Sequence, residues 1–457
     1  MTTAGPGSGP GGAPTAIALS PILSARYRTR DLERIRAAAP GARLVTVSIE
    51  GLADGPLDDV EVMLRGWLNS DAFDRLLARA PRLAWVHSAT SGVERALTPA
   101  SRERGLIVTN ARGVFSRPIA EYVLMMILAV SRRLPQLLEL QRERTWQPLE
   151  GSELRDVTVG IVGLGSIGRA VGALATAFGC RVIAVRRRPE SGVEPARDGD
   201  DLSFGEAMLD RVGGPEMLPE LLGESDFIVL AAPLTPETED MINADTLAMV
   251  KPGAWRINVA RGRLIDERAL LRALRDGPLG GAVLDTFREE PLPALSSFYE
   301  LPNVIVTPHT AWSSGRVLDR VGGPEMLPEL LGESDFIVLA APLTPETEDM
   351  INADTLSMVK PGAWLINVAR GRLIDERALL RALRDGPLGG AVLDTFREEP
   401  LPALSSFYEL PNVIVTPHTA WSSGRVLDRS VELFCDNLRR FANGEPLLNV
   451  VDPAAGY

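Results

Sequence analysis

The sequence contains very few of the residues that build disulfide frameworks, metal sites or basic surfaces. Its 457 residues include two cysteines and three histidines, and acidic residues outnumber basic ones to give a net charge of −12. Two cysteines cannot form a disulfide framework and are not spaced as a metal site, so we expect no metal and a reducing, cytoplasmic location. A nucleic-acid partner would need a basic face, and the acidic balance argues against one.

Long hydrophobic runs are also missing from the sequence. The longest, Val123–Val130, has eight residues, whereas about 20 are needed to span a bilayer. We therefore expect a buried helix there and no membrane partner. Residues 1–14 are rich in Gly, Pro and Ser and lack the basic start and apolar stretch of a signal peptide, which predicts a flexible leader.

What the sequence does contain is a long internal repeat. Asp210–Leu318, here called copy one, aligns without a gap with Asp319–Leu427, copy two. The two copies differ at two positions, Ala248/Ser357 and Arg256/Leu365. Solenoid repeats are about 20–50 residues long and diverged, so this unit is too long and too uniform for that class. It indicates a recent tandem duplication or an error of sequence assembly.

Alternating strand and helix signals precede the repeat and predict an α/β layer structure. Short apolar strands are expected at Ala16–Leu19, Arg43–Val47, Asp59–Leu64, Ala84–His87 and Ile107–Asn110, with helices at Arg28–Ala39 and Ser70–Arg79. A strongly apolar helix is then expected over Pro118–Arg133, with the stretch to Trp146 also helical. It suits a position between domains or at a dimer interface, or an ordinary core.

The clearest local motif is Gly163-Leu-Gly165-Ser-Ile-Gly168, which lies between the apolar strand Val157–Val162 and a helix that runs through Phe178. A strand, Arg181–Val185, follows. In such a βαβ unit the glycines permit a tight turn, close approach of a pyrophosphate and helix–strand packing, while the helix N-terminus binds phosphate. The motif therefore predicts a dinucleotide site rather than an unliganded turn.

The end of the second strand of this unit carries arginines instead of an acid. NAD sites usually place Asp or Glu there against the ribose 2′-hydroxyl. This chain has Arg186, Arg187 and Arg188, with no acid before Glu190. Arginines would pair with a 2′-phosphate, which favours NADPH over NADH; the alternative is a solvated surface turn.

Each copy reads as the second half of the same dinucleotide-binding domain. In copy one, strands are expected at Phe227–Ala231, Ala254–Val259 and Ala282–Leu284. The carboxyl ends of strands in a doubly wound sheet line the ligand crevice. Arg261, Asp285 and Glu290 follow these strands, and the chain's histidines include one near the end of each copy, so acid–base chemistry is expected there.

At this point the sequence resembles the D-isomer-specific 2-hydroxyacid dehydrogenases. The matching stretches are GIVGLGSIGRAV, APLTPET, KPGAW followed by INVARGRLIDERAL, GAVLDTFREEPLP, LPNVIVTPHTA, WVHSATSGVER and TNARGVFSRPIAEYVLMMILA. The arginine cluster and TPHTAW look most like the glyoxylate/hydroxypyruvate reductase branch. The resemblance implies a Rossmann-type doubly wound domain over 118–427, whose second half is duplicated. It also implies a smaller flavodoxin-like α/β substrate domain over 15–117, completed by 428–457, and a homodimer.

The resemblance also implies roles for particular residues. The catalytic arginine, glutamate and histidine match Arg261, Glu290 and His309 in copy one and Arg370, Glu399 and His418 in copy two. Substrate carboxylate binding falls on Ser91, Gly92 and Val93. Dinucleotide binding falls on Gly163, Gly165, Ser166, Ile167, Gly168, Arg186, Arg187, Pro233, Pro342, Ala260, Ala369, Asp285 and Asp394. The implied reaction is reduction of a small 2-oxo acid to the D-2-hydroxy acid with NADPH or NADH, the histidine donating the proton.

Two departures from the family pattern bear on these expectations. Trp312 and Trp421 stand where the family commonly has glycine, which puts the substrate in doubt. The duplication offers two candidates for one place in the domain. Arg256 would put an unpaired charge into a buried strand where copy two has Leu365, so the sequence favours copy two as the working half.

Two other functions remain compatible with the sequence. One is an NAD-linked relative that acts on formate or phosphoglycerate, which the arginine cluster argues against. The other is a dinucleotide-binding protein without turnover, either a corepressor-like module that binds a partner or an enzyme inactivated by its extra copy.

Overall fold

The computed structural model describes residues 14–21, 29–66, 68–89, 93, 95–111, 114–187, 209–311, 327–341 and 343–420. The chain divides into two compact units. The first comprises Met1–Ala120, Leu164–Val171 and Gly192–Gly205, and the second comprises Glu121–Gly163, Gly172–Ser191 and Glu206–Tyr457. The strands of the described residues form parallel sheets of five, seven and four strands.

The first unit contains the five-stranded sheet. Its strands are β1 (Ala16–Leu19), β2 (Arg43–Thr46), β3 (Val60–Arg65), β4 (Trp85–Ser88) and β5 (Ile107–Asn110), and its helices are α1 (Thr29–Ala38), α2 (Ser70–Arg79) and α3 (Pro99–Glu103). The strand order β2-β1-β3-β4-β5 is that of flavodoxin-like sheets. Helix α2 buries Phe73 and Leu76 against this sheet, which confirms the predicted flavodoxin-like fold.

The seven-stranded sheet joins the Gly-rich segment to copy one. Its strands are β6 (Thr158–Val162), β7 (Arg181–Val185), β8 (Arg211–Gly213), β9 (Phe227–Leu230), β10 (Trp255–Asn258), β11 (Gly281–Leu284) and β12 (Val304–Val306). The order β12-β11-β10-β9-β6-β7-β8 is doubly wound, with β6 at the point where the order reverses. This confirms the Rossmann-type prediction.

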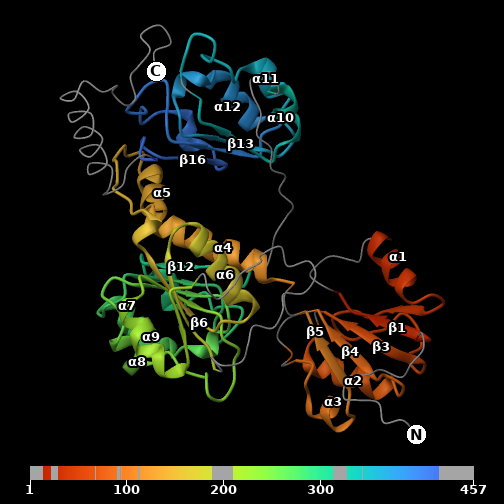
Figure 1. Cartoon of the computed structure of the whole chain (residues 1–457). Helices are drawn as coiled ribbons and strands as arrows, with labels where there is room; N and C mark the ends of the chain where they lie inside the picture. Colours follow the sequence, from red (N-terminus) through yellow and green to blue (C-terminus); the bar gives the residue numbers. More distant parts are fainter. Residues whose placement is uncertain are drawn as a thin grey trace, which may run out of the picture. The chain divides into compact units, whose positions relative to one another are not determined.

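Helices cover the faces of this sheet (Figure 1). They are α6 (Ser166–Ala177), α7 (Leu218–Glu224), α8 (Ala244–Ala248) and α9 (Glu267–Arg275). Helix α9 is amphipathic: Leu270 and Leu274 are buried, and Asp266 caps its N-terminus by accepting hydrogen bonds from two backbone N–H groups. Its apolar side joins α7 and α8 in one cluster with Ile228 and Leu284 of the strands.

Copy two forms a separate four-stranded half-sheet. Its strands are β13 (Phe336–Leu339), β14 (Trp364–Asn367), β15 (Gly390–Leu393) and β16 (Val413–Val415), and its helices are α10 (Leu327–Glu333), α11 (Ala353–Ser357) and α12 (Glu376–Arg384). The order β13-β14-β15-β16 repeats the order β9 to β12 of copy one. Among the described residues, no strand pairs with the outer edge of β13.

A pair of helices precedes the Gly-rich segment and contacts both copies. They are α4 (Ser116–Ser131) and α5 (Leu134–Arg142). The Tyr122 hydroxyl lies 2.5 Å from Thr307 Oγ1 of copy one. The Gln141 amide donates to Val413 O and accepts from Val415 N, at 2.8 Å each, so that α5 lies beside β16 of copy two (Figure 1).

The predicted elements agree closely with the structure. Strands β1, β5 and β7 and helix α2 have the predicted bounds. Strands β8 and β12 were not predicted. The segment 428–457, which was predicted to complete the first domain, lies outside the described residues.

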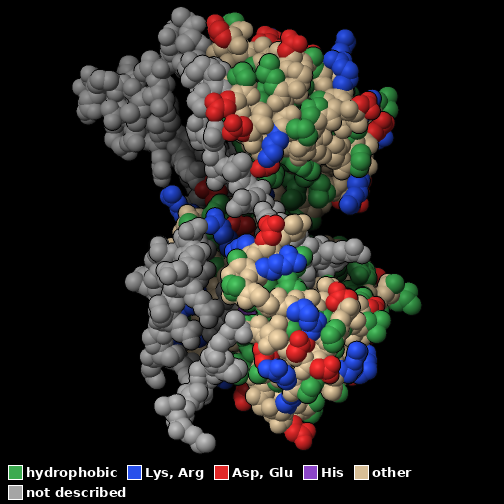
Figure 2. Space-filling view, turned by 90° about the vertical axis from the view of Figure 1, so that its right-hand side faces the viewer, with side chains coloured by type: hydrophobic (Ala, Val, Ile, Leu, Met, Phe, Trp, Pro, Cys, Tyr) green, Lys and Arg blue, Asp and Glu red, His purple; other side chains and the backbone are tan. Residues whose placement is uncertain are grey.

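Charged side chains of both signs lie on the surface. On the side in view in Figure 2, Lys and Arg side chains are interspersed with Asp and Glu. Within the described part of the chain, no helix is both long enough and apolar enough to cross a membrane.

Candidate active site

The Gly-rich segment leaves room for a phosphate next to the start of a helix. Gly163 has φ +104°, and a Cβ there would lie 2.5 Å from Ala232 N, so only glycine fits this turn against copy one. A Cβ on Gly165 would meet nothing within 4 Å. Helix α6 begins at the next residue, Ser166, and so presents its free N–H groups there. These residues fit a dinucleotide pyrophosphate.

The two described arginines of the cluster lie where β7 ends. The backbone N–H of Arg186 donates to Gly213 O at 2.9 Å, which ties the turn to β8. The Arg186 side chain is half-buried and that of Arg187 is exposed, while Arg188 lies outside the described residues. Both described side chains are at the strand end where a ribose 2′ group is held in such folds.

In copy one, the predicted histidine and glutamate form a pair. His309 Nδ1 lies 2.9 Å from Glu290 Oε2, and Glu290 Oε1 accepts from Phe287 N at 3.0 Å. Burial raises the pKa of Glu290, but the hydrogen bonds from His309 and Phe287 and the charges of His309 and Arg261 outweigh it, so this pKa lies below its ordinary value. The carboxylate therefore stays ionised beside the imidazole ring.

A buried aspartate fixes the loop that carries His309. Asp285, at the end of β11, accepts from Thr307 Oγ1 at 2.7 Å and from Thr310 N and Ala311 N at 2.8 and 3.0 Å. These bonds bracket His309, whose φ of +52° is unusual for a residue with a side chain. Asp285 thus holds the strained backbone that directs the imidazole.

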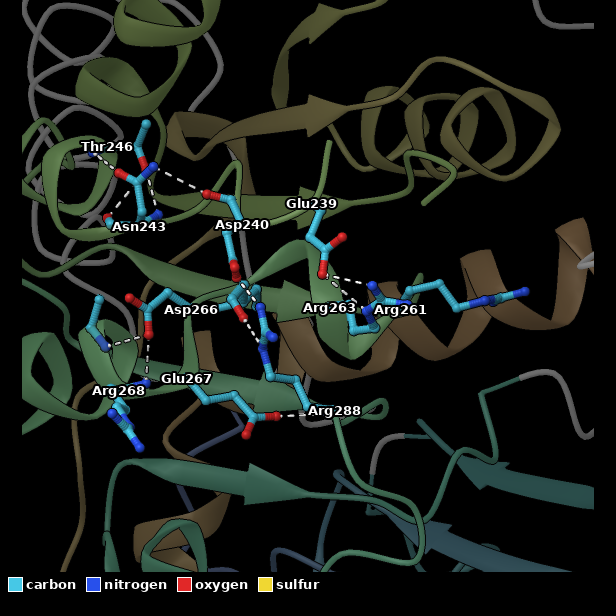
Figure 3. A network of polar contacts seen from close by, with 12 residues as sticks. Glu239, Asp240, Asn243, Thr246, Arg261, Arg263, Asp266, Glu267, Arg268 and Arg288 are labelled. Atoms are coloured by element: carbon cyan, nitrogen blue, oxygen red, sulfur yellow. Dashed lines mark hydrogen bonds and ion pairs between the residues drawn. The ribbon is translucent and has the colours of Figure 1, made fainter. Parts of the chain in front are cut away.

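The loop of the predicted catalytic arginine, Arg261, follows the end of β10. Asn258 Nδ2 donates to Arg261 O at 3.1 Å, and Asn258 Oδ1 accepts from Ala260 N at 3.1 Å. A Cβ on Gly262 would lie 1.9 Å from the Phe287 carbonyl carbon, so glycine is required for these loops to meet. Figure 3 shows the Arg261 side chain extending away from the neighbouring ion pair between Arg263 and Glu239.

Copy two contains the same constellation at nearly the same distances. His418 Nδ1 lies 2.8 Å from Glu399 Oε2, and His418 also has φ +52°. Asp394 accepts from Thr416 Oγ1, Thr419 N and Ala420 N at 2.6, 2.8 and 2.9 Å. Asn367 Nδ2 donates to Arg370 O at 3.0 Å, as in copy one. The local sequence therefore builds this half-site without the Gly-rich segment.

Some predicted site residues are not brought together by the structure. Ser91, Gly92, Pro342, Trp312 and Trp421 lie outside the described residues. Val93 is described and lines a cavity of about 520 Å³ in the first unit. The other lining residues are His87, Leu97, Val108, Thr109 and Asn110. Pro233 is exposed, and Ala260 is buried, in the loops that follow β9 and β10. Ala369, the counterpart of Ala260 in copy two, is half-buried.

Sequence reasoning missed the residues that support the site. Asn258 and Asn367 are fully buried and hydrogen-bond the backbone of Arg261 and Arg370. An asparagine at the end of a predicted strand, three residues before the arginine, was the available signal. Tyr122 gave no local signal, because Thr307 is distant in sequence. Burial raises the pKa of Tyr122 to about 12, so its hydroxyl stays protonated.

The structure pairs copy one, and not copy two, with the Gly-rich segment. The sequence favoured copy two as the working half, but copy one pairs with β6, in register from Val159↔Phe227 to Val162↔Leu230. Arg256 is 0% exposed in this sheet, and its guanidinium has no hydrogen-bond partner among the described residues, so the charge burdens copy one without preventing its pairing with β6. Which copy works stays a prediction.

Comparison with known proteins agrees with this geometry. The family model "D-isomer specific 2-hydroxyacid dehydrogenase, NAD binding domain" matches residues 124–311 and, a second time, residues 317–420. These ranges cover more than half of the chain. The chain belongs to the D-isomer specific 2-hydroxyacid dehydrogenase family. The first match includes most of copy one, and the second begins at residue 317, two residues before copy two.

Its relatives in this dehydrogenase family carry different names. The chain is 35% identical over 308 residues to D-3-phosphoglycerate dehydrogenase of Mycobacterium bovis, covering 66% of this chain and 54% of the relative. It is 32% identical over 319 residues to glyoxylate reductase of Thermococcus onnurineus, covering 67% and 86%. The chain thus spans about half the length of the phosphoglycerate dehydrogenases it matches.

Solved structures of the family resemble the fold over most of their length. The NADPH-dependent glyoxylate/hydroxypyruvate reductase of Sinorhizobium meliloti, solved with NADP and sulfate, is 28% identical, with a TM-score of 0.52 over 65% of this chain and 90% of that chain. A family member from Xanthobacter autotrophicus, solved with NADPH and MES, is 25% identical, with a TM-score of 0.54 over 97% and 100%. A nicotinamide dinucleotide is therefore the cofactor class of this dehydrogenase fold.

Proposed function

We propose that this chain reduces a small 2-oxo acid of the glyoxylate/hydroxypyruvate type to the D-2-hydroxy acid, with NADPH preferred over NADH. The supporting observation is the His309–Glu290 pair, with Arg261 near enough to act on Glu290, in one sheet with the Gly-rich segment. Arg186 and Arg187 at the end of β7 support the NADPH preference, because guanidinium groups pair with a 2′-phosphate.

Each residue of the site would have a separate role in the reaction. When bound, the dinucleotide supplies the hydride. Arg261 binds the substrate's carboxylate and keto oxygen with its planar donors. His309, charged and oriented by Glu290, gives its proton to the developing alkoxide through Nε2, because Nδ1 is committed to the glutamate. Asp285 holds the histidine loop in place. In copy two, Arg370, Glu399, His418 and Asp394 would have the same roles.

The test is oxidation of NADPH with glyoxylate and with hydroxypyruvate, compared with NADH and with 3-phosphoglycerate oxidation by NAD. We expect turnover with NADPH and a small 2-oxo acid. Turnover only with NAD and 3-phosphoglycerate would overturn the proposed substrate and cofactor. Cofactor binding without any turnover would favour the alternative, a dinucleotide-binding protein that does no chemistry. A homodimer and a cytoplasmic location remain predictions, to be tested by light scattering and fractionation.

A further inference from the structure

The surface that receives β6 exists twice in this chain. Strands β9 and β13 have the same sequence, but only β9 pairs with β6. Phe227 and Val229 are 5% and 0% exposed, whereas the equivalent Phe336 and Val338 are 51% and 57% exposed. Val368 is 42% exposed and its equivalent Val259 is 6% exposed. The open edge and face of copy two are thus the residues that copy one buries against the Gly-rich half, residues 157–185.

The helix side of this contact is also duplicated. A Cβ on Gly160 of β6 would lie 2.7 Å from Leu221 Cδ2 and 2.2 Å from Ser225 Oγ, so copy one packs directly on the glycine backbone. Copy two carries Leu330 and Ser334 at these places; Leu330 is half-buried, whereas Leu221 is 0% exposed, and Ser334 is buried. Copy two therefore offers the same two side chains to Gly160, with the leucine more exposed than its counterpart in copy one.

Two differences between the pairings act in opposite directions. Phe227 follows Val185 by 42 residues and Phe336 follows it by 151. Loop closure scales with length to the power of −3/2, so the longer connection disfavours copy two by roughly sevenfold. Arg256 acts in the opposite direction: none of its guanidinium nitrogens has a hydrogen-bond partner among the described residues, and it is 0% exposed. Undocked, copy one can open and free this side chain.

We propose that the Gly-rich half exchanges between the two copies within one chain, so that His309 and His418 belong to two alternative catalytic half-sites sharing one dinucleotide-binding segment. The Gly-rich half that pairs with β13 comes from the same chain, because a tethered segment has an effective concentration in the millimolar range. The half-site of copy two is already assembled, with His418 Nδ1 2.8 Å from Glu399 Oε2. Its use in catalysis rests on the proposed function, whereas the exchange of strands does not.

Disulfide trapping tests the exchange without any assay of activity. Cys180 and Cys435 are first replaced by alanine. Val159→Cys is then combined with Phe227→Cys, its partner in the structure, or with Phe336→Cys, its partner after exchange. Directly paired strand positions lie within the Cα separation that a disulfide spans. We expect the 159–227 disulfide to form at once and the 159–336 disulfide to accumulate within the same chain, detected by peptide mass spectrometry at dilute protein.

Three results would overturn the proposal. The first is that the 159/336 variant forms no disulfide although the 159/227 variant does. The second is that the disulfide between positions 159 and 336 forms only between two chains. The third is a disulfide between the positions 336 of two chains. Adding Arg256→Leu to the 159/336 variant should lower the yield of the 159–336 disulfide several-fold, because this substitution stabilises copy one. Adding Leu365→Arg should also lower that yield, because it destabilises copy two. An unchanged yield in both would mean that the disulfide reports unfolding rather than exchange.

A second measurement keeps the test decisive if a cysteine variant misfolds. His309→Asn should retain at least about a tenth of the wild-type rate, since the loop-closure bias alone is about sevenfold. Complete loss in this variant, with full activity in His418→Asn, would exclude a working copy two. If the unaltered protein is inactive, the proposed function fails, and disulfide trapping alone decides the exchange.

Discussion

Copy one and copy two differ at two positions but have different surroundings. Copy one forms the C-terminal half of a seven-stranded sheet, where β9 has β6 on one side and β10 on the other. Copy two keeps the same strand order, with an unpaired edge on β13 among the described residues. At the opposite edge of each sheet, copy two is the better covered. Its edge strand β16 is hydrogen-bonded by Gln141, and Val413 and Val415 are 3% and 4% exposed. The equivalent residues of β12 in copy one, Val304 and Val306, are half-buried. Each copy lacks a partner that the other has.

The catalytic loops are insensitive to this difference. The histidine–glutamate distances are 2.9 and 2.8 Å, and both histidines have φ +52°. Hydrogen bonds that arise within each copy are enough to build the half-site. The sheet edge, in contrast, can be completed only by a strand from elsewhere in the chain. The comparison separates what a copy supplies by itself from what it must obtain from the Gly-rich half.

The largest expected effect comes from removing both histidines. His309→Asn with His418→Asn should lower kcat/KM for the 2-oxo acid by about 10²- to 10⁴-fold, because no side chain remains to protonate the alkoxide. NADPH binding, measured by fluorescence titration, should be unchanged. Full activity in the double variant would show that neither histidine is the proton donor.

The next largest effect is on stability, at the buried position where the copies differ, Arg256 in copy one and Leu365 in copy two. Arg256→Leu should raise the free energy of unfolding by about 3–5 kcal/mol, because it removes a buried cation without a partner. Leu365→Arg should lower it by a similar amount. Urea unfolding of both variants checks this. The exposed substitution Ala248→Ser, which makes the other difference uniform, is the control and should be neutral.

The same residue predicts a pH dependence. Burial lowers the pKa of Arg256 to about 9. The destabilisation by the buried charge is therefore fully present below pH 9, and it declines as the pH rises above 9, because the buried guanidinium then loses its proton while the unfolded chain keeps it. The stability gap between Arg256→Leu and the unaltered protein should narrow between pH 8 and about pH 10. A constant gap would mean that the guanidinium finds a partner.

A smaller effect should distinguish the outer edges of the copies. Gln141→Ala removes two hydrogen bonds to β16, each contributing about 1 kcal/mol. Hydrogen exchange should then accelerate in the β14 peptide that contains Leu365 and not in the β10 peptide that contains Arg256. These peptides can be assigned because they carry the sequence difference. Equal acceleration in both would contradict a contact specific to copy two.

The smallest effect concerns the glutamate of the pair. The pKa of Glu290 lies below its ordinary value of 4.5, so its contribution to stability is present above pH 4.5 and is lost as the pH falls through the lowered value. Glu290→Gln should therefore be less stable than the unaltered protein at neutral pH, with the gap closing in acid. Thermal unfolding from pH 3 to pH 7 provides the measurement.

Much of the fold was predictable because its signals are local. The alternation of short apolar strands with helices predicted the α/β sheets, and the glycine spacing placed β6, α6 and β7 correctly. The family resemblance matched Glu290 and His309 to a catalytic pair, and the structure brings the two side chains within 2.9 Å. The partnership of Tyr122 with Thr307 could not be predicted, since it depends on how α4 packs against copy one.

The sequence by itself determined each half-site, because hydrogen bonds within a copy set the loops around His309 and His418 wherever that copy lies. It also determined that two equal halves exist. Only the tertiary structure decided which half pairs with β6, and it placed copy one there against the argument drawn from Arg256. The physical reason is that burial of a strand edge depends on a distant partner. Two identical edges present the same pattern to any reading of the sequence, and the chain's connectivity distinguishes them.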